Sequence, residues 1–451
     1  LRSWVIHWNE VAINASGVDH TPVAAGENRV FGEQIGPGRS ARAMAIVHIA
    51  VFDSIIAING GYKSYTGIAR VKSPASTKAA VAVAAHDTLA ALFPSQRASF
   101  HQELMDSMRR LLGESPTAIA NGILAGKRAS AAILNLRRVD GSQHKEPVLG
   151  VDHNTSNEAG HWRQDPVSLS TVALGAHWGA VKPFVMESGR QFRAPPPPAM
   201  TSAEYTEAFN EVKRLGGDGI TTTTERTEDQ TFAGLFWAYD GTPSLCAPPR
   251  LYNQIAVEII KQRRTSAIGA ARLLALINVA QADAGIAIWE SKFFYDFWRP
   301  VGGVREADVG MGPSGAGDGN ADTIADPNFM PLGAPASNLN GPNFTPPFPA
   351  YPSGHAGFGG ALFQILRRFY GADNIAFTFV SDEFNGVTRD NNGNVRPLRP
   401  RSFKTLSEAE EENGQSRIYL GIHWSFDKSD GITQGQRVAD YVWFRTYLPT
   451  R

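Results

Sequence analysis

The chain has 451 residues, of which 42% are hydrophobic and 19% are charged. This composition is typical of a globular protein and excludes an intrinsically disordered chain. Lysine plus arginine (43) balance aspartate plus glutamate (43), so the net charge of zero gives no sign of a nucleic-acid partner. Cys246 is the single cysteine, which excludes an intrachain disulfide and any cluster of cysteine ligands, and we expect it to be a buried structural thiol.

Helical periodicity dominates the first part of the sequence. Its longest apolar stretch is interrupted by His48 and Asp53, and a second such stretch further on by Arg272 and Gln281, so we expect no membrane-spanning helix. Residues 139–202 lose the periodic pattern and predict a long ordered connection. Apolar residues spaced three and four apart predict helices over 39–59, 76–93, 96–112 and 117–138.

The second part of the sequence is also predominantly helical. Residues 302–351 are the exception, because this stretch is rich in Gly, Pro and Asn, and irregular segments of that length are usually functional. The pattern predicts helices over 202–215, 227–239, 252–262, 265–298, 354–370, 406–419 and 429–447.

Alternating β patterns are scarce, so we predict an all-α fold. The expected architecture is two four-helix bundles with long ordered loops around an active site. We expect an N-terminal helical region over residues 1–200 and a region that carries the active site over residues 201–451, together forming one fold.

The first segment with chemical potential runs from Lys292 to Pro300. Lys292 and Arg299 are seven residues apart, which is two helical turns, so both cations should project from nearly one face of a helix. Two cations on an otherwise aromatic stripe suggest a bound anion. Alternatively, Asp296 forms an ordinary ion pair with Lys292, four residues away.

The second segment, residues 351–360, contains Pro-Ser-Gly-His before an apolar helical stretch. The backbone N–H groups of Ser353 and Gly354 at a helix N-terminus would bind an anion, and the Ser353 hydroxyl could donate as well. His355 would then stand beside the anion as a general acid–base. Alternatively, Ser353 is a plain N-cap and His355 a structural histidine.

The third segment, residues 416–427, adds Arg417 and His423. Asp427 lies four residues beyond His423 and could orient its ring. Alternatively, the segment is an amphipathic helix end followed by a capped turn. Taken together, the three segments supply the groups that hold a tetrahedral oxyanion: guanidinium forks, an ammonium group, backbone N–H groups and two imidazoles.

The combined pattern is Lys-x6-Arg-Pro, then Pro-Ser-Gly-His, then Ser-Arg-x5-His-x3-Asp. In this it resembles the vanadium-dependent haloperoxidases and the related acid phosphatases. Residues 236–241, 248–254 and 298–305 are similar to the haloperoxidase branch, especially the fungal chloroperoxidases and their bacterial relatives. The algal bromoperoxidases are similar too, but they carry a different pair, including an additional histidine, at the positions of Trp289 and Phe348.

The resemblance implies a role for each matching position. His423 would be the nitrogen ligand of vanadium, and His355 the acid–base residue beside the apical hydroxide. Asp240 would pair with Arg417. Trp289 and Phe348 would line the peroxide and halide site, and Tyr239 would join that wall. The donors to the equatorial vanadate oxygens would be Lys292, Arg299, Ser353, Gly354 and Arg417.

The implied activity is oxidation of iodide, bromide or chloride by hydrogen peroxide to hypohalous acid, via a peroxovanadate. His355 would accept a proton from peroxide, Lys292 would polarise it, and a small organic acceptor would take up the halogen. The alternative is an acid phosphatase with a phosphohistidine at His423. A weaker alternative is an oxyanion-binding protein without turnover.

The family and the first residue, Leu1 rather than Met, suggest a secreted or periplasmic protein, and the sequence does not determine whether a signal peptide was removed. The sequence does not determine the preferred halide, the organic acceptor or the oligomeric state.

Overall fold

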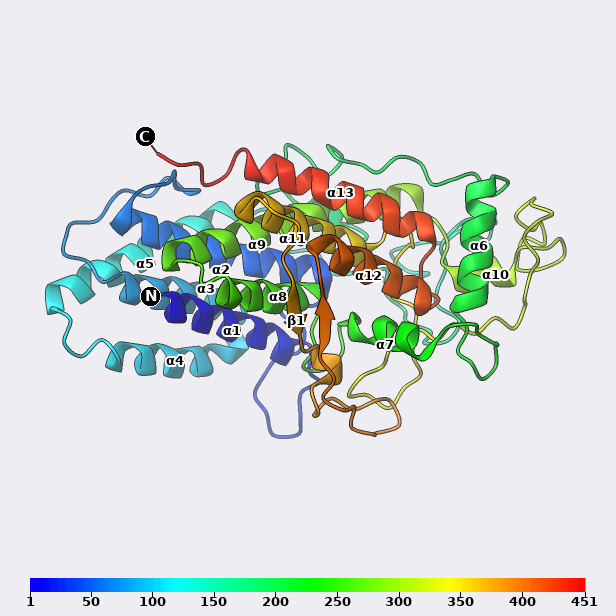
Figure 1. Ribbon diagram of the computed structural model, residues 1–451, viewed down its shortest axis with the longest axis horizontal. Coiled ribbons are helices and arrows are strands. Elements are labelled where there is room, and N and C mark those ends of the chain that lie inside the picture. Colours follow the sequence, from blue (N-terminus) through cyan, green and yellow to red (C-terminus); the bar gives the residue numbers. More distant parts are fainter. Residues whose placement is uncertain (451) are drawn as a thin grey trace.

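The computed structural model describes residues 1–450, and most of its regular structure is helical (Figure 1). The all-α prediction is confirmed. The first five helices are α1 (Arg2–Asp19), α2 (Gly36–Asn59), α3 (Thr77–Leu92), α4 (Arg97–Arg109) and α5 (Pro116–Leu136). The next five are α6 (Ala203–Leu215), α7 (Glu228–Phe236), α8 (Pro248–Gln262), α9 (Ala267–Tyr295) and α10 (Pro300–Arg305). The last three are α11 (Gly354–Tyr370), α12 (Leu406–Tyr419) and α13 (Ser425–Trp443).

Regular structure outside these helices is short. Strands β1 (Phe377–Phe379) and β2 (Arg401–Phe403) pair antiparallel. Three single-turn 3-10 helices are η1 (Pro94–Gln96), η2 (Trp178–Ala180) and η3 (Asp382–Phe384). The sequence pattern did not predict helices α1 and α10, this strand pair or the three 3-10 helices.

Helices α2 and α9 form the centre of the molecule. By length and composition both could cross a membrane, but 94% of the apolar window of each is buried inside the protein, as in the core helices of globular proteins. The largest hydrophobic cluster includes both helices and further side chains from α1 to α13. The division at residue 200 stays a prediction, and Arg451, the last residue of the predicted C-terminal region, lies outside the described residues.

Helices α11 and α13 approach each other closely through glycines. A Cβ atom on Gly431 would lie 2.8 Å from the carbonyl oxygen of Ser353, and one on Gly435 would overlap the carbonyl oxygen of Gly357. Because only glycine permits such an approach, the N-terminus of α11 is held against the start of α13. The Ser353 N–H donates to the carbonyl oxygen of Asp427 at 3.0 Å, which fixes this junction.

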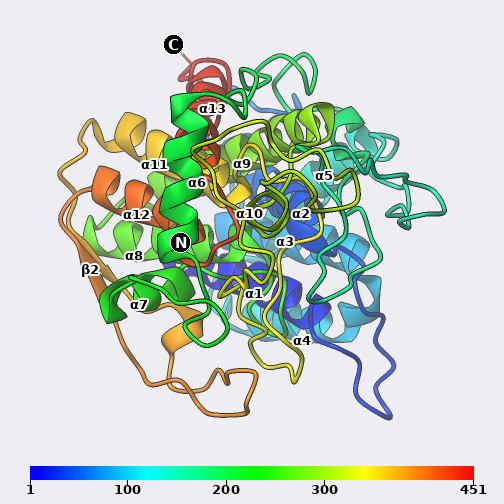
Figure 2. The ribbon, with the colours of Figure 1, turned by 90° about the vertical axis from the view of Figure 1, so that its right-hand side faces the viewer.

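The long irregular segments cover one end of the helices. Figure 2 views the molecule from that end and shows α6, α10 and the yellow loops of residues 302–351 in front of the core. Backbone hydrogen bonds join these loops to distant segments: Leu174 N–H donates to Pro347 O at 3.0 Å, and Ala350 N–H donates to Phe297 O at 2.9 Å. The predicted loops are therefore ordered and packed over the end of the bundle.

Candidate active site

Lys292 and Arg299 do not lie on one helix, so the predicted helical face is wrong. Helix α9 ends at Tyr295, and Asp296 takes the left-handed conformation (φ 51°) as its C-cap. Pro300 then starts α10, with Arg299 at its N-cap. Asp296 does not pair with Lys292 either, because its carboxylate accepts a hydrogen bond from His161 Nδ1 at 2.9 Å.

Although the helix breaks between them, Lys292 and Arg299 both contact the backbone of residues 348–350. Lys292 Nζ donates to the carbonyl oxygens of Pro349 and Ala350, both at 2.9 Å, and Arg299 Nε donates to Phe348 O at 2.9 Å. The Phe348 ring centroid lies 5.2 Å from Lys292 Nζ and 5.0 Å from Arg299 Cζ. Both cations are buried, and burial lowers the pKa of Lys292 well below its ordinary value and that of Arg299 to about 9.

His423 lies between Arg299 and a carboxylate. Arg299 Nη1 approaches His423 Nε2 at 2.9 Å, and since a guanidinium can only donate, Nε2 is the acceptor. His423 Nδ1 therefore carries the proton and donates it to Asp427 Oδ2 at 2.7 Å. Burial, and then the charge of Arg299, lower the pKa of His423 well below its ordinary value. This pattern of contacts fits the neutral ring, with the Nε2 lone pair directed at Arg299.

The N-terminus of α11 presents Ser353, Gly354 and His355. Ser353 is the N-cap, accepting the Ala356 N–H at 3.3 Å, so the structural interpretation of this residue is confirmed while its hydroxyl proton stays free to donate. The His355 carbonyl oxygen accepts hydrogen bonds from Tyr252 Oη and Asn413 Nδ2, both at 2.9 Å, which anchor this turn.

The His355 ring is oriented by the backbone. Its Nε2 lies 2.5 Å from the carbonyl oxygen of Ala238 and must donate to it, so Nδ1 is the nitrogen left without a hydrogen bond among residues 1–450. Burial, and then the charge of Arg417, lower the pKa of His355 well below its ordinary value. The neutral ring can therefore accept a proton at Nδ1.

Arg417 pairs with Asp240, as the resemblance implies. Arg417 Nη2 donates to Asp240 Oδ1 at 2.6 Å and Nη1 donates to Oδ2 at 3.2 Å. The two side chains are 1% and 6% exposed. Arg417 Nε is buried and has no partner among the described residues, so the pair leaves a donor for another acceptor.

The charges of this cluster do not balance. With every group in its ordinary ionised form, Lys292, Arg299 and Arg417 would bring three positive charges against the two negative charges of Asp240 and Asp427. Burial opposes this concentration of charge, because it lowers the pKa of Lys292 and raises the pKa of both carboxyl groups. A buried unpaired charge is unfavourable, and a bound anion removes this imbalance. The unpartnered Arg417 Nε, the Ser353 hydroxyl and the His423 lone pair suit a tetrahedral oxyanion whose central atom accepts a nitrogen ligand.

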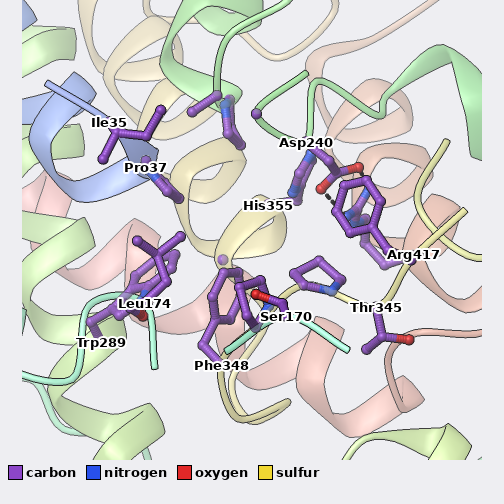
Figure 3. A pocket seen from close by; sticks show the side chains of 18 of the residues that line it. Ile35, Pro37, Ser170, Leu174, Asp240, Trp289, Thr345, Phe348, His355 and Arg417 are labelled. Atoms are coloured by element: carbon purple, nitrogen blue, oxygen red, sulfur yellow. Dashed lines mark hydrogen bonds and ion pairs between the residues drawn. The ribbon is translucent and has the colours of Figure 1, made fainter. Parts of the chain in front are cut away.

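A cavity of about 280 Å³ opens onto this cluster (Figure 3). Gly354, His355, Arg417 and His423 line it directly, as do Trp289 and Phe348 at the positions expected for the halide wall. The remaining predicted residues lie behind this lining: Lys292, Arg299 and Ser353.

Tyr239 does not line the cavity, so it does not join the wall as we expected. Its hydroxyl accepts the Asp382 N–H at 2.7 Å and donates to Gln254 Oε1 at 2.8 Å. Several further lining residues were not predicted, because no local motif marks them: Ile35, Pro37, Ser168, Ser170, Leu174 and Thr345. Thr345 lies in the 302–351 segment that was expected to be functional, and the others come from the N-terminal part of the chain.

Comparisons with known proteins show which family the chain is similar to. The family described as VCPO second helical-bundle domain matches residues 272–448. The vanadium chloroperoxidase of Curvularia inaequalis is 32% identical over 513 aligned positions, which cover 94% of this chain and 79% of that protein.

Solved structures share the fold. A bacterial vanadium-dependent iodoperoxidase superposes with a TM-score of 0.74 at 22% identity, covering 99% of this chain and 98% of its own. The holo form of a bacterial vanadium-dependent chloroperoxidase superposes with a TM-score of 0.66 at 15% identity, covering 93% of both chains. At these identities the likeness concerns the fold alone.

Proposed function

The chain belongs to the vanadium-dependent haloperoxidases, and we propose that its buried cation cluster holds the vanadate on which that activity depends. The protein is accordingly an enzyme, with vanadate as its cofactor. One observation carries the assignment of the site: His423 Nε2 faces Arg299 as an acceptor while Asp427 holds the opposite ring nitrogen. This is the arrangement that a nitrogen ligand requires.

The residues present fit vanadate. His423 Nε2 would bind the metal. Vanadate, when bound, supplies a Lewis acid that activates hydrogen peroxide towards a halide. The excess positive charge of the cluster matches an anion, and the donors stand on four different elements, so the site is preorganised by the fold. The donors to the oxygen atoms would be Lys292, Arg299, Ser353, Gly354 and Arg417.

His355 would move the proton. Its Nε2 is held by the Ala238 carbonyl, so a proton from hydrogen peroxide would be taken up at Nδ1. Burial, and then the charge of Arg417, lower the pKa of this ring, which favours its neutral form. Lys292 has two of its three N–H groups on backbone carbonyls, and the third would donate to an oxygen of the bound anion or of peroxide.

Hydrogen peroxide and a halide are therefore the small-molecule partners that this family uses. Trp289 and Phe348, whose ring centroids are 5.0 Å apart, would form the apolar wall beside the halide. We also propose that the enzyme works outside the cytoplasm and without a nucleic-acid or membrane partner. Iodide should be oxidised fastest and chloride slowest, since electron removal is hardest from chloride.

Reconstitution tests the proposal. Vanadate-free protein is titrated with orthovanadate, and triiodide formation from iodide and hydrogen peroxide is followed. We expect activity to saturate at one vanadate per chain and inorganic phosphate to inhibit by competing for the same cluster. Phosphomonoester hydrolysis without vanadate, combined with no triiodide formation after loading, would instead indicate a phosphatase.

A further inference from the structure

We propose that a second cavity, which borders Arg299, binds a large monovalent anion such as bromide or iodide, and that this anion weakens vanadate binding through its charge. The anion site itself does not depend on the proposed function. The coupling does rest on it, because the coupling requires vanadate beside Arg299.

The second cavity is lined by residues from the 161–166 segment and from the region of helix α10, at the end of the molecule that the long loops cover (Figure 2). Its volume is about 200 Å³, and it shares no lining residue with the larger cavity among residues 1–450. Arg299 lines the second cavity, while its guanidinium contacts Phe348 O and His423 Nε2, both at 2.9 Å. Because Phe348 and His423 line the larger cavity, Arg299 stands between the two.

The lining of the second cavity is rich in positive charge. The guanidinium groups of Arg163, Arg299 and Arg305 line it together with one carboxylate, that of Glu306. Glu306 forms an ion pair with Arg163 and accepts a hydrogen bond from it. Arg305 donates from Nε to the neutral carbonyl oxygen of Phe329 at 2.8 Å and has no carboxylate partner among residues 1–450.

Two further carboxyl groups lie nearby, and both have other partners. Asp296 pairs with His161, whose Nδ1 donates to it at 2.9 Å. Asp165 counters part of the charge of Arg299 and accepts hydrogen bonds from backbone N–H groups. Neither carboxylate pairs with Arg305, so the positive charge of Arg305 is left for an anion from solution.

Arg163 also has an unused donor. Its Nη2 is held by Glu306, whereas its Nη1 is buried and has no hydrogen-bond partner among the described residues. A buried N–H group without an acceptor is unfavourable, so the folded protein gains from an acceptor placed beside it. Because Arg163 lines the cavity, an anion bound there is such an acceptor.

The lining favours a large monovalent ion over a tetrahedral oxyanion. Each oxygen of sulfate or phosphate needs donors of its own once water is removed, and much of this lining is the apolar surface of Trp298, Val301 and Pro313. Bromide and iodide are weakly hydrated, so they lose less on leaving water and need fewer donors. A cavity of about 200 Å³ holds such an ion with part of its water shell.

An anion in this cavity lies beside a cation that the vanadate site uses. Two anions near Arg299 repel each other and share one counter-charge, so binding of either weakens binding of the other. Charges are screened less inside a protein than in water. We therefore expect vanadate affinity to fall about three- to tenfold when the second cavity is filled.

The first measurement locates the ion. Crystals of the vanadate-free protein are soaked in sodium bromide, and anomalous scattering is recorded at the bromine absorption edge. We expect a bromide peak beside Arg163 Nη1 that is absent from Arg163→Gln and from Arg305→Gln. Arg214→Gln, which removes an arginine from an exposed ion pair with Glu225, is the matched control and should keep the peak. No bromide peak in the wild-type cavity would overturn the site.

The second measurement is vanadate affinity, followed by vanadium-51 NMR titration with and without bromide at constant ionic strength and without peroxide. We expect bromide to raise the vanadate Kd about three- to tenfold more in wild type and in Arg214→Gln than in Arg163→Gln or Arg305→Gln. Glu306→Gln removes the only carboxylate of the lining, so this variant should respond at lower bromide concentration than wild type. A purely structural role of these residues would not produce that opposite change.

The two parts of the inference fail in different ways. A bromide peak combined with equal bromide effects on vanadate Kd in wild type and Arg163→Gln would overturn the coupling. A failure of the proposed function would appear as no vanadate binding even without bromide, and the crystal measurement would still decide whether the anion site exists.

Discussion

Asp427 accepts the Nδ1 proton of His423 at 2.7 Å, and this contact decides which ring nitrogen faces Arg299. The same carboxylate oxygen also accepts the Trp424 N–H at 3.0 Å. Asp427 therefore fixes the tautomer and the orientation of the imidazole together, although it does not itself line the cavity.

Replacing Asp427 with asparagine should lower vanadate affinity about 10- to 100-fold, because the ring loses the partner that keeps Nε2 unprotonated. Vanadium-51 NMR titration of the protein measures this directly. Asp440→Asn, on the same helix but paired with Arg368 at the surface, should leave the affinity unchanged. Equal vanadate affinities for wild type and Asp427→Asn would contradict the assignment of His423 Nε2 as a ligand that depends on Asp427.

His355→Ala should retain vanadate but lose turnover. The expected fall in kcat is about 100- to 10,000-fold, the usual effect of removing a general acid–base. His101→Ala replaces an exposed histidine and serves as the control. Rates of triiodide formation at saturating vanadate decide the matter, and a kcat near that of wild type would show that another group moves the proton.

Lys292→Met should impair both anion binding and turnover. The substitution keeps the apolar stem but removes the ammonium, one of three cations in the cluster. We expect vanadate affinity to fall about 10- to 100-fold, since a charged hydrogen bond is lost. The exposed Lys261→Met is the matched control. Normal binding and normal halide oxidation in Lys292→Met would exclude Lys292 from the mechanism.

Asp240→Ala should destabilise the fold more than the equivalent change in an exposed pair. It leaves the buried Arg417 guanidinium without its carboxylate, which should lower the free energy of unfolding by about 3–5 kcal/mol. The Asp106–Arg109 pair is exposed, so Asp106→Ala should lower the free energy of unfolding by less than about 1 kcal/mol. Denaturant unfolding of the vanadate-free proteins compares the two, and similar losses would contradict the account of the Arg417 pair.

His48 should make the protein acid-sensitive. It is buried in α2 with Nε2 on Asn9 Oδ1 at 3.0 Å, and burial lowers its pKa from 6.5 to about 3. Between these values the unfolded chain binds a proton that the folded protein does not bind, so stability falls as the pH drops below 6.5. From about pH 7.5 to about pH 4.5 this contribution amounts to roughly 2–3 kcal/mol.

The His48 effect is isolated by comparing variants. Unfolding free energies of wild type and His48→Gln are measured at both pH values, and the variant should lose less stability on acidification. The exposed His101→Gln should behave as wild type. Equal acid sensitivity in all three proteins would show that His48 does not contribute.

Local signals explain why some elements could be predicted in full. Helix α11 begins and ends where the sequence indicates, because Ser353 caps its start and Gly371 takes the left-handed conformation (φ 66°) at its end. The spacing of His423 and Asp427 likewise predicts their contact, which the structure shows at 2.7 Å. In both cases the interacting residues are close in sequence: Ser353 with Ala356, Gly371 with Arg367, and His423 with Asp427.

Other features depend on tertiary structure and produce no periodic pattern in the amino-acid sequence. Asp296 adopts a left-handed conformation without being glycine or asparagine, so the sequence pattern predicts a helix that continues to Trp298. The apolar side of the cavity combines Ile35, Leu174 and Phe344 from three distant segments. Nothing in the spacing of these residues marks them as neighbours, because loop packing alone brings them together.

The close approach of α11 and α13 gives residues far from any substrate control over the chemistry. A methyl group at Gly435 would force the two helices apart, and since Ser353 begins one of them and His423 immediately precedes the other, the oxygen-binding side and the metal-binding side of the anion pocket would separate. A metal site requires its ligands to be placed to within tenths of an ångström. Separating the helices would therefore weaken anion binding even though every ligand residue is still present. The distance between the backbones of α11 and α13 thus sets the distance between the His423 imidazole and the donors at the start of α11. Substitutions at Gly431 or Gly435 should therefore change the reactivity of the site without removing a ligand.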